Sequence, residues 1–305
     1  MFLYSGFKDT AGDAALFVSV FHSVSAFCNA GFSLFSENLV NYTTNYTVCI
    51  TIMLLIISGG IGFVVIQDIG KRIRHKTLKL SLHTKVVIVN TMILIVAGAV
   101  VYLLFEMHTS FRNLTTGQMI LASFFQSVTP RTAGFNTINQ AAMTLPSKVF
   151  TLPLMLIGGS PGSISGGVKV TTAFLVIVSA FRGMEAGSEL RIGRRKISGK
   201  AIAKANMFML KAMLLLFCGT FMLTITEISL RSDSKAFLEI LFECFSAFGT
   251  VGLSLGITPE LTAPGKIVVI LMMFAGRVGL ISMAMSVARR VKRDVDYPVG
   301  EVLIG

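Results

Sequence analysis

Arg131-Thr132-Ala133-Gly134-Phe135-Asn136 is one of three versions of a single phrase; the others are Cys28-Asn29-Ala30-Gly31-Phe32-Ser33 and Gly249-Thr250-Val251-Gly252-Leu253-Ser254. The three glycines lie 103 and 118 residues apart, so the phrases belong to a large repeated unit. A glycine between small and bulky residues suits neither a helix core nor a strand core. It suits an extended backbone whose carbonyl groups turn toward something. Because each phrase also ends an apolar stretch, the pattern favours a path for ions.

The composition predicts a membrane protein. The chain has 305 residues, of which 53% are hydrophobic and 14% charged, and its mean hydropathy is +0.75. Soluble domains carry about a quarter charged residues. Four scattered cysteines show no CxxC spacing, which favours free thiols over a disulfide framework or a zinc site. No carboxylate pair or nucleophile–base pair has positions suggesting a shared pocket, which argues against an enzyme.

The net charge of +12 is unevenly placed. Of the 27 Lys and Arg residues, 17 fall within 71–85, 182–204 and 289–293, each just after a long apolar run. Cytoplasmic loops have this character under the positive-inside rule. We therefore expect these loops and the C-terminus in the cytoplasm. Acidic residues mark the outer side: Asp9, Asp13, Glu37, Glu106, Glu227, Asp233 and Glu260.

The apolar segments are of two lengths. A helix needs roughly 20 apolar residues to cross the hydrocarbon core, and five stretches are long enough: 46–68, 84–105, 147–181, 205–226 and 266–288. Three shorter stretches each end at a glycine phrase, and we expect them to be half-length pore helices that enter the membrane and return as a loop: 12–27, 115–128 and 235–248.

This order predicts an all-α membrane protein built from units of helix, pore helix, glycine phrase and helix. Residues 76–183 hold one such unit with a broken second helix, and 184–305 hold another with a C-terminal tail. Residues 1–75 hold a pore helix, a glycine phrase and an inner helix, without an outer helix before residue 12. Repeats in a membrane chain indicate pseudo-symmetry around the transport path.

The glycine phrases have the character of a cation filter. A dehydrated cation replaces its water shell with oxygens, which pores supply from backbone carbonyls of short extended loops. The preceding pore helix directs the negative end of its dipole at the ion. The alternative is that the glycines permit close helix packing. Three equivalent positions in three units favour the filter.

A second feature interrupts the stretch 147–181. Residues 156–169 contain five glycines, one proline and three serines in the middle of a span. Such backbone is tolerated at that depth only where it lines a water-filled path or is enclosed in protein. We expect a mobile intramembrane loop here, against the alternative of a simple proline kink. Arg277 lies mid-span in 266–288, where a charge must face protein or water, and we expect it beside this loop.

Together these motifs resemble the Trk/Ktr/HKT superfamily of potassium transporters, and most closely the membrane subunit of bacterial Ktr systems. The resemblance covers essentially the whole chain, up to the tail 297–305. It implies a filter formed by Asn29, Ala30, Gly31, Phe32, Thr132, Ala133, Gly134, Phe135, Thr250, Val251, Gly252 and Leu253. It implies a gate formed by Gly158, Gly159, Ser160, Pro161, Gly162, Ser163, Ser165, Gly166, Gly167 and Arg277.

The resemblance further implies four repeats around one pore, with K⁺ as the substrate held at filter carbonyls and Na⁺ as an activator. It implies a homodimer in the cell membrane, on a cytoplasmic ring of nucleotide-binding regulatory subunits, with no covalent cofactor. The family has four repeats, however, and this chain has two and most of a third. The filters here are then the second, third and fourth, and we hypothesise an N-terminally truncated chain that does not conduct selectively alone.

Other classes fit the sequence less well. A tetrameric potassium channel needs one filter per chain, and this chain has three. A sodium- or proton-coupled secondary transporter places ionisable residues within its helices, and here Arg277 and Lys211 are nearly the only ones. A structural scaffold has no need of three glycine phrases.

Overall fold

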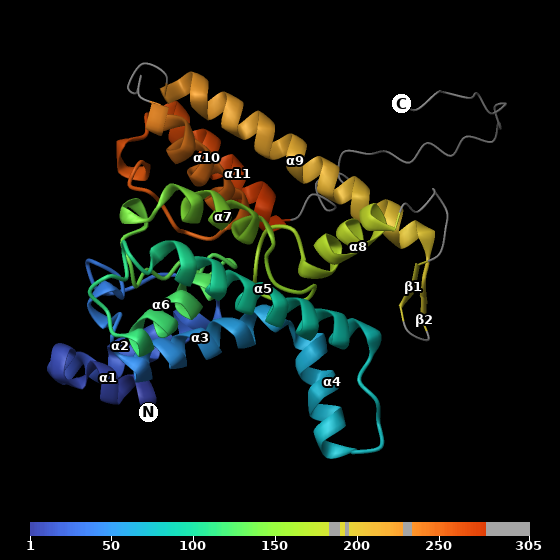
Figure 1. Ribbon diagram of the computed structural model, residues 1–305, viewed down its shortest axis with the longest axis horizontal. Coiled ribbons are helices and arrows are strands. Elements are labelled where there is room, and N and C mark those ends of the chain that lie inside the picture. Colours follow the sequence, from blue (N-terminus) through green and yellow to red (C-terminus); the bar gives the residue numbers. More distant parts are fainter. Residues whose placement is uncertain (183–189, 193–194, 228–233, 279–305) are drawn as a thin grey trace.

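The computed structural model describes residues 1–182, 190–192, 195–227 and 234–278, and the described part is almost entirely helical (Figure 1). Four short 3-10 turns and one small antiparallel hairpin, which was not expected, accompany the helices. The hairpin strands are β1 (Leu190–Ile192) and β2 (Arg195–Ile197). The helices are α1 Phe2–Ala11, α2 Ala15–Phe27, α3 Tyr46–Ile61, α4 Phe63–Arg74, α5 Leu82–Glu106, α6 Thr116–Val128, α7 Leu145–Leu156, α8 Val170–Phe181, α9 Gly199–Glu227, α10 Ser234–Gly249 and α11 Ala263–Val278.

Two straight helices are long and apolar enough to cross a membrane. Helix α5 has 25 residues and α9 has 29, and their most apolar 18-residue stretches have mean hydropathies of 2.5 and 2.0. At 1.5 Å per residue, both exceed the roughly 30 Å hydrocarbon core. They correspond to the expected spans 84–105 and 205–226. The Ser81 hydroxyl accepts from the Thr84 amide and so caps the start of α5.

The segment Phe2–Phe27 is also long and apolar enough to span, but it folds back on itself. The rings of Phe7 and His22 have centroids 5.1 Å apart. In one straight helix, residues this far apart in sequence would be separated by about 22 Å. The reversal occurs at Gly12, whose φ is +52°. Helix α2 is therefore a short helix packed beside α1, as expected for 12–27.

The expected span 46–68 is not one straight helix. Helix α3 ends at Ile61, and α4 continues from Phe63 at an angle of 99°. Gly62 between them has a φ of +89°, in the left-handed region that glycine adopts without steric penalty. Helix α4 ends in Lys71, Arg72 and Arg74, and it extends away from the other helices (Figure 1). Its polar character explains the turn, because the second half of a span needs apolar residues.

The stretch 147–181 is broken, as expected. Helix α7 ends at Leu156, α8 starts at Val170, and the backbone between them is not helical. In the last expected span, 266–288, α11 covers the residues up to Val278, and the remainder lies outside the described residues.

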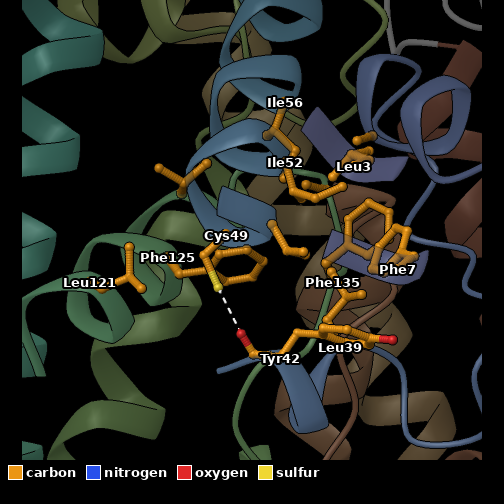
Figure 2. Packing of buried hydrophobic residues seen from close by; sticks show 14 of the residues in the cluster. Leu3, Phe7, Leu39, Tyr42, Cys49, Ile52, Ile56, Leu121, Phe125 and Phe135 are labelled. Carbon is orange, nitrogen blue, oxygen red and sulfur yellow. Dashed lines mark hydrogen bonds between the residues drawn. The ribbon is translucent and has the colours of Figure 1, made fainter. Parts of the chain in front are cut away.

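The short helices α2, α6 and α10 bring the glycine phrases into the molecule, although one face of α2 is exposed. Helix α6 packs against α5 and α3, and α10 packs against α7, α9 and α11. One hydrophobic core joins α1, α2 and α3 to Phe125 of α6 and to Phe135, which follows the middle glycine (Figure 2). Residues far apart in the sequence thus meet around the three phrases.

Candidate ion path and gate

The three phrases, called the glycine loops from here on, share one backbone conformation. In each loop the glycine and the residue two before it have positive φ. A residue with a Cβ pays roughly 1–2 kcal/mol to adopt this conformation, so its recurrence in three sequences indicates one built geometry. The values are +49° for Asn29, +70° for Gly31, +68° for Thr132, +78° for Gly134, +51° for Thr250 and +89° for Gly252.

The glycines lie where neighbouring loops touch. A Cβ on Gly31 would be 2.5 Å from the carbonyl oxygen of Ala133, and a Cβ on Gly134 would be 2.2 Å from that of Val251. Both distances are far below contact distance, so the backbone of the next loop occupies the space of a side chain. The first loop therefore lies beside the middle one, and the middle beside the last. These glycines do not lie between two packed helices, which was the alternative interpretation.

Serine and threonine residues at the ends of the short helices bond to the glycine loops, through their carbonyls before the glycine and through their hydroxyls after it. The carbonyl of Ser25 accepts from Ala30 N at 2.9 Å, and that of Ser246 accepts from Val251 N at 2.8 Å. The Ser25 hydroxyl donates to Phe32 O at 2.8 Å, and the Thr129 hydroxyl donates to Phe135 O at 2.7 Å. The loops thus turn directly off the C-terminal ends of α2, α6 and α10, where the helix dipole is negative.

In two of the three loops, the bulky residue after the glycine packs in the hydrophobic core. Phe135 is fully buried among Phe7, Leu39 and Tyr42 (Figure 2). Leu253 is buried in a cluster with Leu152 and Met155 of α7. Phe32 differs, with 70% of its surface exposed. These three bulky residues therefore offer a cation only their backbone oxygens.

Several of these oxygens have no protein donor. Within the described residues, the carbonyls of Thr132, Ala133 and Gly134 accept no hydrogen bond, and the same holds for those of Thr250, Val251 and Gly252. Gly31 O is different, because the Asn38 amide donates to it at 3.3 Å. Asn38 also accepts from Asn136 N at 3.2 Å. It therefore bridges the first and middle loops, which no sequence signal indicated.

The stretch 157–169, called the α7–α8 loop, is closed at its base by backbone bonds. Gly158 N donates to Val168 O at 2.9 Å, and Val168 N donates to Leu156 O at 3.0 Å. Its tip turns at Pro161 and Gly162, where the Ser163 hydroxyl donates to Ser160 O at 2.6 Å. The loop is thus a compact structure and not a kink in a continuous helix.

The α7–α8 loop lies between the first and last units. Ser160 N donates to Gly60 O at 2.9 Å, and the Ser160 hydroxyl donates to Ile61 O, both at the end of α3. On the other side, a Cβ on Gly166 would be 2.2 Å from the Thr250 hydroxyl of the last glycine loop. Ser165 is also hydrogen-bonded to the Asn29 side chain at 3.1 Å, and a Cβ on Gly158 would be 3.2 Å from the Thr132 methyl group. The expected gate residues are therefore next to all three glycine loops.

Two cations donate to consecutive carbonyls of this loop. The Arg277 guanidinium donates to Ile164 O, so Arg277 lies beside the loop as expected. The Lys169 ammonium donates to Ser165 O. Lys169 was not among the residues expected at the gate. A lysine that ends a glycine-rich stretch at membrane depth is nevertheless a sequence signal for a functional site.

Another buried cation lies in the middle loop. Arg131 is almost completely buried, and its Nε has no partner among the described residues. Beside it is a cavity of about 10 Å³ lined by Asn29, Gly60 and Gly159. The hydroxyls of Thr132 and Thr137 and the Asn136 side-chain oxygen are also buried without a partner in the described part of the chain. The middle loop is thus richer in unpaired buried polar atoms than its surroundings.

Comparison with known proteins places this geometry in a family. The model of the TrkH family, described as cation transport protein, matches residues 4–295. The chain is 42% identical over 294 residues to the Ktr system potassium uptake protein B of Bacillus subtilis, covering 96% of this chain and 64% of the relative. It is 34% identical over 304 residues to the protein of the same name from Vibrio alginolyticus, covering 99% and 66%.

A third relative, the potassium/sodium uptake protein NtpJ of Enterococcus hirae, is 35% identical over 294 residues, covering 95% of this chain and 64% of the relative. The crystal structure of the potassium transporter TrkH from Vibrio parahaemolyticus shares the fold with a TM-score of 0.75 at 19% identity, over 95% of this chain and 62% of that one. The chain thus spans about two thirds of the length of the curated relatives it matches. It belongs to the TrkH family of cation transport proteins.

Proposed function

We propose that this protein is the membrane subunit of a Ktr/Trk-type system and takes up potassium through the three glycine loops. The observation that carries the proposal is their common backbone, with paired left-handed residues and neighbouring loops in contact through their glycines. Unpaired carbonyls in the middle and last loops supply the oxygens that a dehydrated cation requires. The buried polar atoms of the middle loop suit the same path.

The α7–α8 loop acts as the gate in this proposal. It contacts Gly60 and Ile61 at the end of α3 on one side and the last glycine loop on the other. Arg277 and Lys169 hold its carbonyls and add positive charge beside the loop. A cation passing this point meets both a physical obstacle and electrostatic repulsion. Moving the loop away removes both.

The relatives support the wider assembly. Two of them are named as parts of a Ktr system, which favours a membrane subunit working with partner subunits. In the proposal this subunit is a homodimer in the cell membrane, with its basic loops facing a cytoplasmic nucleotide-binding regulatory ring. K⁺ is the substrate, and Na⁺ serves as an activator.

Buried carboxylates do not favour a coupled secondary transporter. Both oxygens of Glu106 and of Glu227 accept hydrogen bonds from hydroxyl or amide donors of nearby threonines, so these carboxylates serve packing.

Growth of a potassium-uptake-deficient bacterial strain tests the proposal. The full-length protein, expressed with its regulatory subunit, is expected to restore growth at low K⁺ and to take up K⁺ in preference to Na⁺ when reconstituted in vesicles. The Gly134→Ser variant at matched expression is expected to lose much of that preference. Uptake no greater than that of an empty-vector strain, or equal uptake of both ions by the wild type, contradicts the proposal.

A further inference from the structure

In each of the three short helices, one buried polar side chain bonds to a side chain that follows the glycine of its loop. These residues are His22 of α2, Gln126 of α6 and Glu243 of α10. Each is hydrogen-bonded to a side chain in the segment that follows the glycine. They are called the tethers below. None of them belongs to the glycine loops or to the α7–α8 loop.

His22 contacts Ser33 in the first unit. Its Nε2 lies 3.0 Å from the Ser33 hydroxyl, and its Nδ1 lies 2.8 Å from Val18 O. A carbonyl can only accept, so Nδ1 carries the proton, and in the neutral ring Nε2 accepts from Ser33. The ring packs against Phe7 and Phe35, whose centroids each lie 5.1 Å from that of His22. His22 is therefore fixed in one orientation.

Glu243 makes the corresponding contact in the last unit. Its Oε2 accepts from Ser254 at 2.9 Å, and its Oε1 accepts from Thr258 at 2.7 Å. Glu243 precedes Gly252 by the same number of residues as His22 precedes Gly31, and Ser254 follows its glycine as Ser33 does. Two sequences with different polar groups thus form the same link in the same place.

Gln126 makes a related link in the middle unit. Its amide and that of Gln140 exchange two hydrogen bonds, of 2.8 and 3.1 Å, and both residues are buried. Gln126 is one position closer to its glycine than the other tethers, and Gln140 lies further along the chain than Ser33 or Ser254. The middle helix also uses Thr129 where the others use serine. The whole link is therefore shifted, but it is still present.

We infer that the tethers are positioning residues that hold the outer end of each glycine loop and thereby set the preference for K⁺ over Na⁺. The inner end of each loop is fixed by backbone bonds to the end of its helix. At the outer end of the first two loops, the Ser25 and Thr129 hydroxyls bond to Phe32 O and Phe135 O. In each unit the tether adds a side-chain link beyond the glycine. The inference rests on the proposed function of the glycine loops.

The physical reason lies in the size of the ion. Carbonyls that are free to move contract around a smaller cation, whereas carbonyls held apart favour the larger one; cavity size and carbonyl field strength both enter this selectivity. The tether side chains themselves are buried, and a buried polar group that loses its partner is costly. Cutting it is expected to alter selectivity more than maximal uptake.

The experiment measures K⁺ and Na⁺ uptake by the full-length protein in vesicles, with apparent KM and maximal rate for each ion. Glu243→Leu is expected to reduce the K⁺-over-Na⁺ ratio about threefold or more, which corresponds to losing a hydrogen bond of ordinary strength. Glu243→Gln, which can still bond to both hydroxyls, is expected to keep the ratio. The partner-side variant with Ser254→Ala and Thr258→Val is expected to behave like Glu243→Leu, and combining the two is expected to add little.

Matched controls come from the same helices. Cys244→Ala changes the neighbouring residue, which is equally buried but packs in the cluster with Leu216 and Met272. His22→Leu is the corresponding variant in the first unit. Its control is Ser19→Ala, because the Ser19 hydroxyl donates within its own helix, to Ala15 O. Both controls are expected to keep the wild-type ratio.

Different results would overturn the tether inference and the proposed function. The tether inference alone is overturned if the wild type prefers K⁺ but the Leu variants and the partner-side variant keep the wild-type ratio. Thermal unfolding must show that these variants are folded. A loss in Glu243→Leu that the partner-side variant does not reproduce also overturns the tether inference alone. A wild type that prefers another monovalent cation overturns the proposed function, and the tethers are then judged on that ratio. A wild type that transports no monovalent cation overturns both.

Discussion

At the scale of single residues, the glycines do more than relax the backbone. Gly31, Gly134 and Gly256 all have positive φ. A Cβ on Gly256 would meet nothing within 4 Å, whereas a Cβ on Gly31 or Gly134 would meet the carbonyl of the neighbouring loop. Conformational strain and crowding can therefore be separated by comparing equivalent substitutions at these positions.

The first prediction follows from this difference. Gly134→Ala and Gly31→Ala are expected to lower the K⁺-over-Na⁺ preference strongly, because two neighbouring loops must move apart. Gly256→Ala is expected to cost only the conformational strain, about 1–2 kcal/mol of stability, with the ion preference retained. Uptake selectivity and thermal unfolding of the three variants measure the two effects. Equal loss of selectivity in all three would show that backbone strain alone matters.

At the scale of elements, the α7–α8 loop is held by contacts from three directions. Backbone bonds close its base, the end of α3 binds Ser160, and Arg277 of α11 binds Ile164 O. Lys169 adds a contact to Ser165 O from the start of α8. Because the two cations bond consecutive carbonyls, each partly replaces the other when one is lost.

The second prediction concerns these two cations. Arg277→Met and Lys169→Met are each expected to raise K⁺ flux several-fold, because the loop loses a contact and the path loses a positive charge. The double variant is expected to exceed either single variant. Lys211→Met, which removes an exposed cation from α9, serves as the control and is expected to leave the flux unchanged. Flux measured in vesicles decides the question, and lower flux in well-folded single variants would argue against a closed gate.

At the scale of the whole molecule, one packing device occurs twice. Glu106 at the end of α5 accepts from the amide and hydroxyl of Thr144, at 2.8 and 2.7 Å. Glu227 at the end of α9 accepts from the amide and hydroxyl of Thr262, at 3.2 and 2.6 Å. Each threonine immediately precedes an inner helix, α7 or α11. The same joint thus connects outer and inner helices in two distant parts of the chain.

The third prediction is additive destabilisation at these joints. Glu106→Ala and Glu227→Ala are each expected to lower the free energy of unfolding by about 1–3 kcal/mol, because buried donors lose a charged acceptor. The effects are expected to add in the double variant, since the joints share no hydrogen-bonding partner. Glu37→Ala, at an exposed position, is the control. Thermal unfolding in detergent tests this, and a double variant no less stable than either single one would contradict it.

The sequence alone determined the class of the molecule. Apolar stretches of two lengths indicated α5, α9 and the short helices α2, α6 and α10, because the thickness of a membrane fixes how many residues a spanning helix needs. The glycine phrases and the stretch 156–169 indicated the loops, because such residues are unfavourable inside helices. The resemblance built on these motifs pointed to the TrkH family, which the comparisons confirmed.

Only the tertiary structure decided which groups meet. No periodic signal in the sequence indicated the bend at Gly62, the bridge made by Asn38, the contact of Lys169 with Ser165 or the three tethers. A histidine, a glutamine and a glutamate have no common sequence pattern, yet they hold corresponding places beside the three loops. Hydrogen bonding depends on the position and direction of atoms, and these are fixed only when the helices pack.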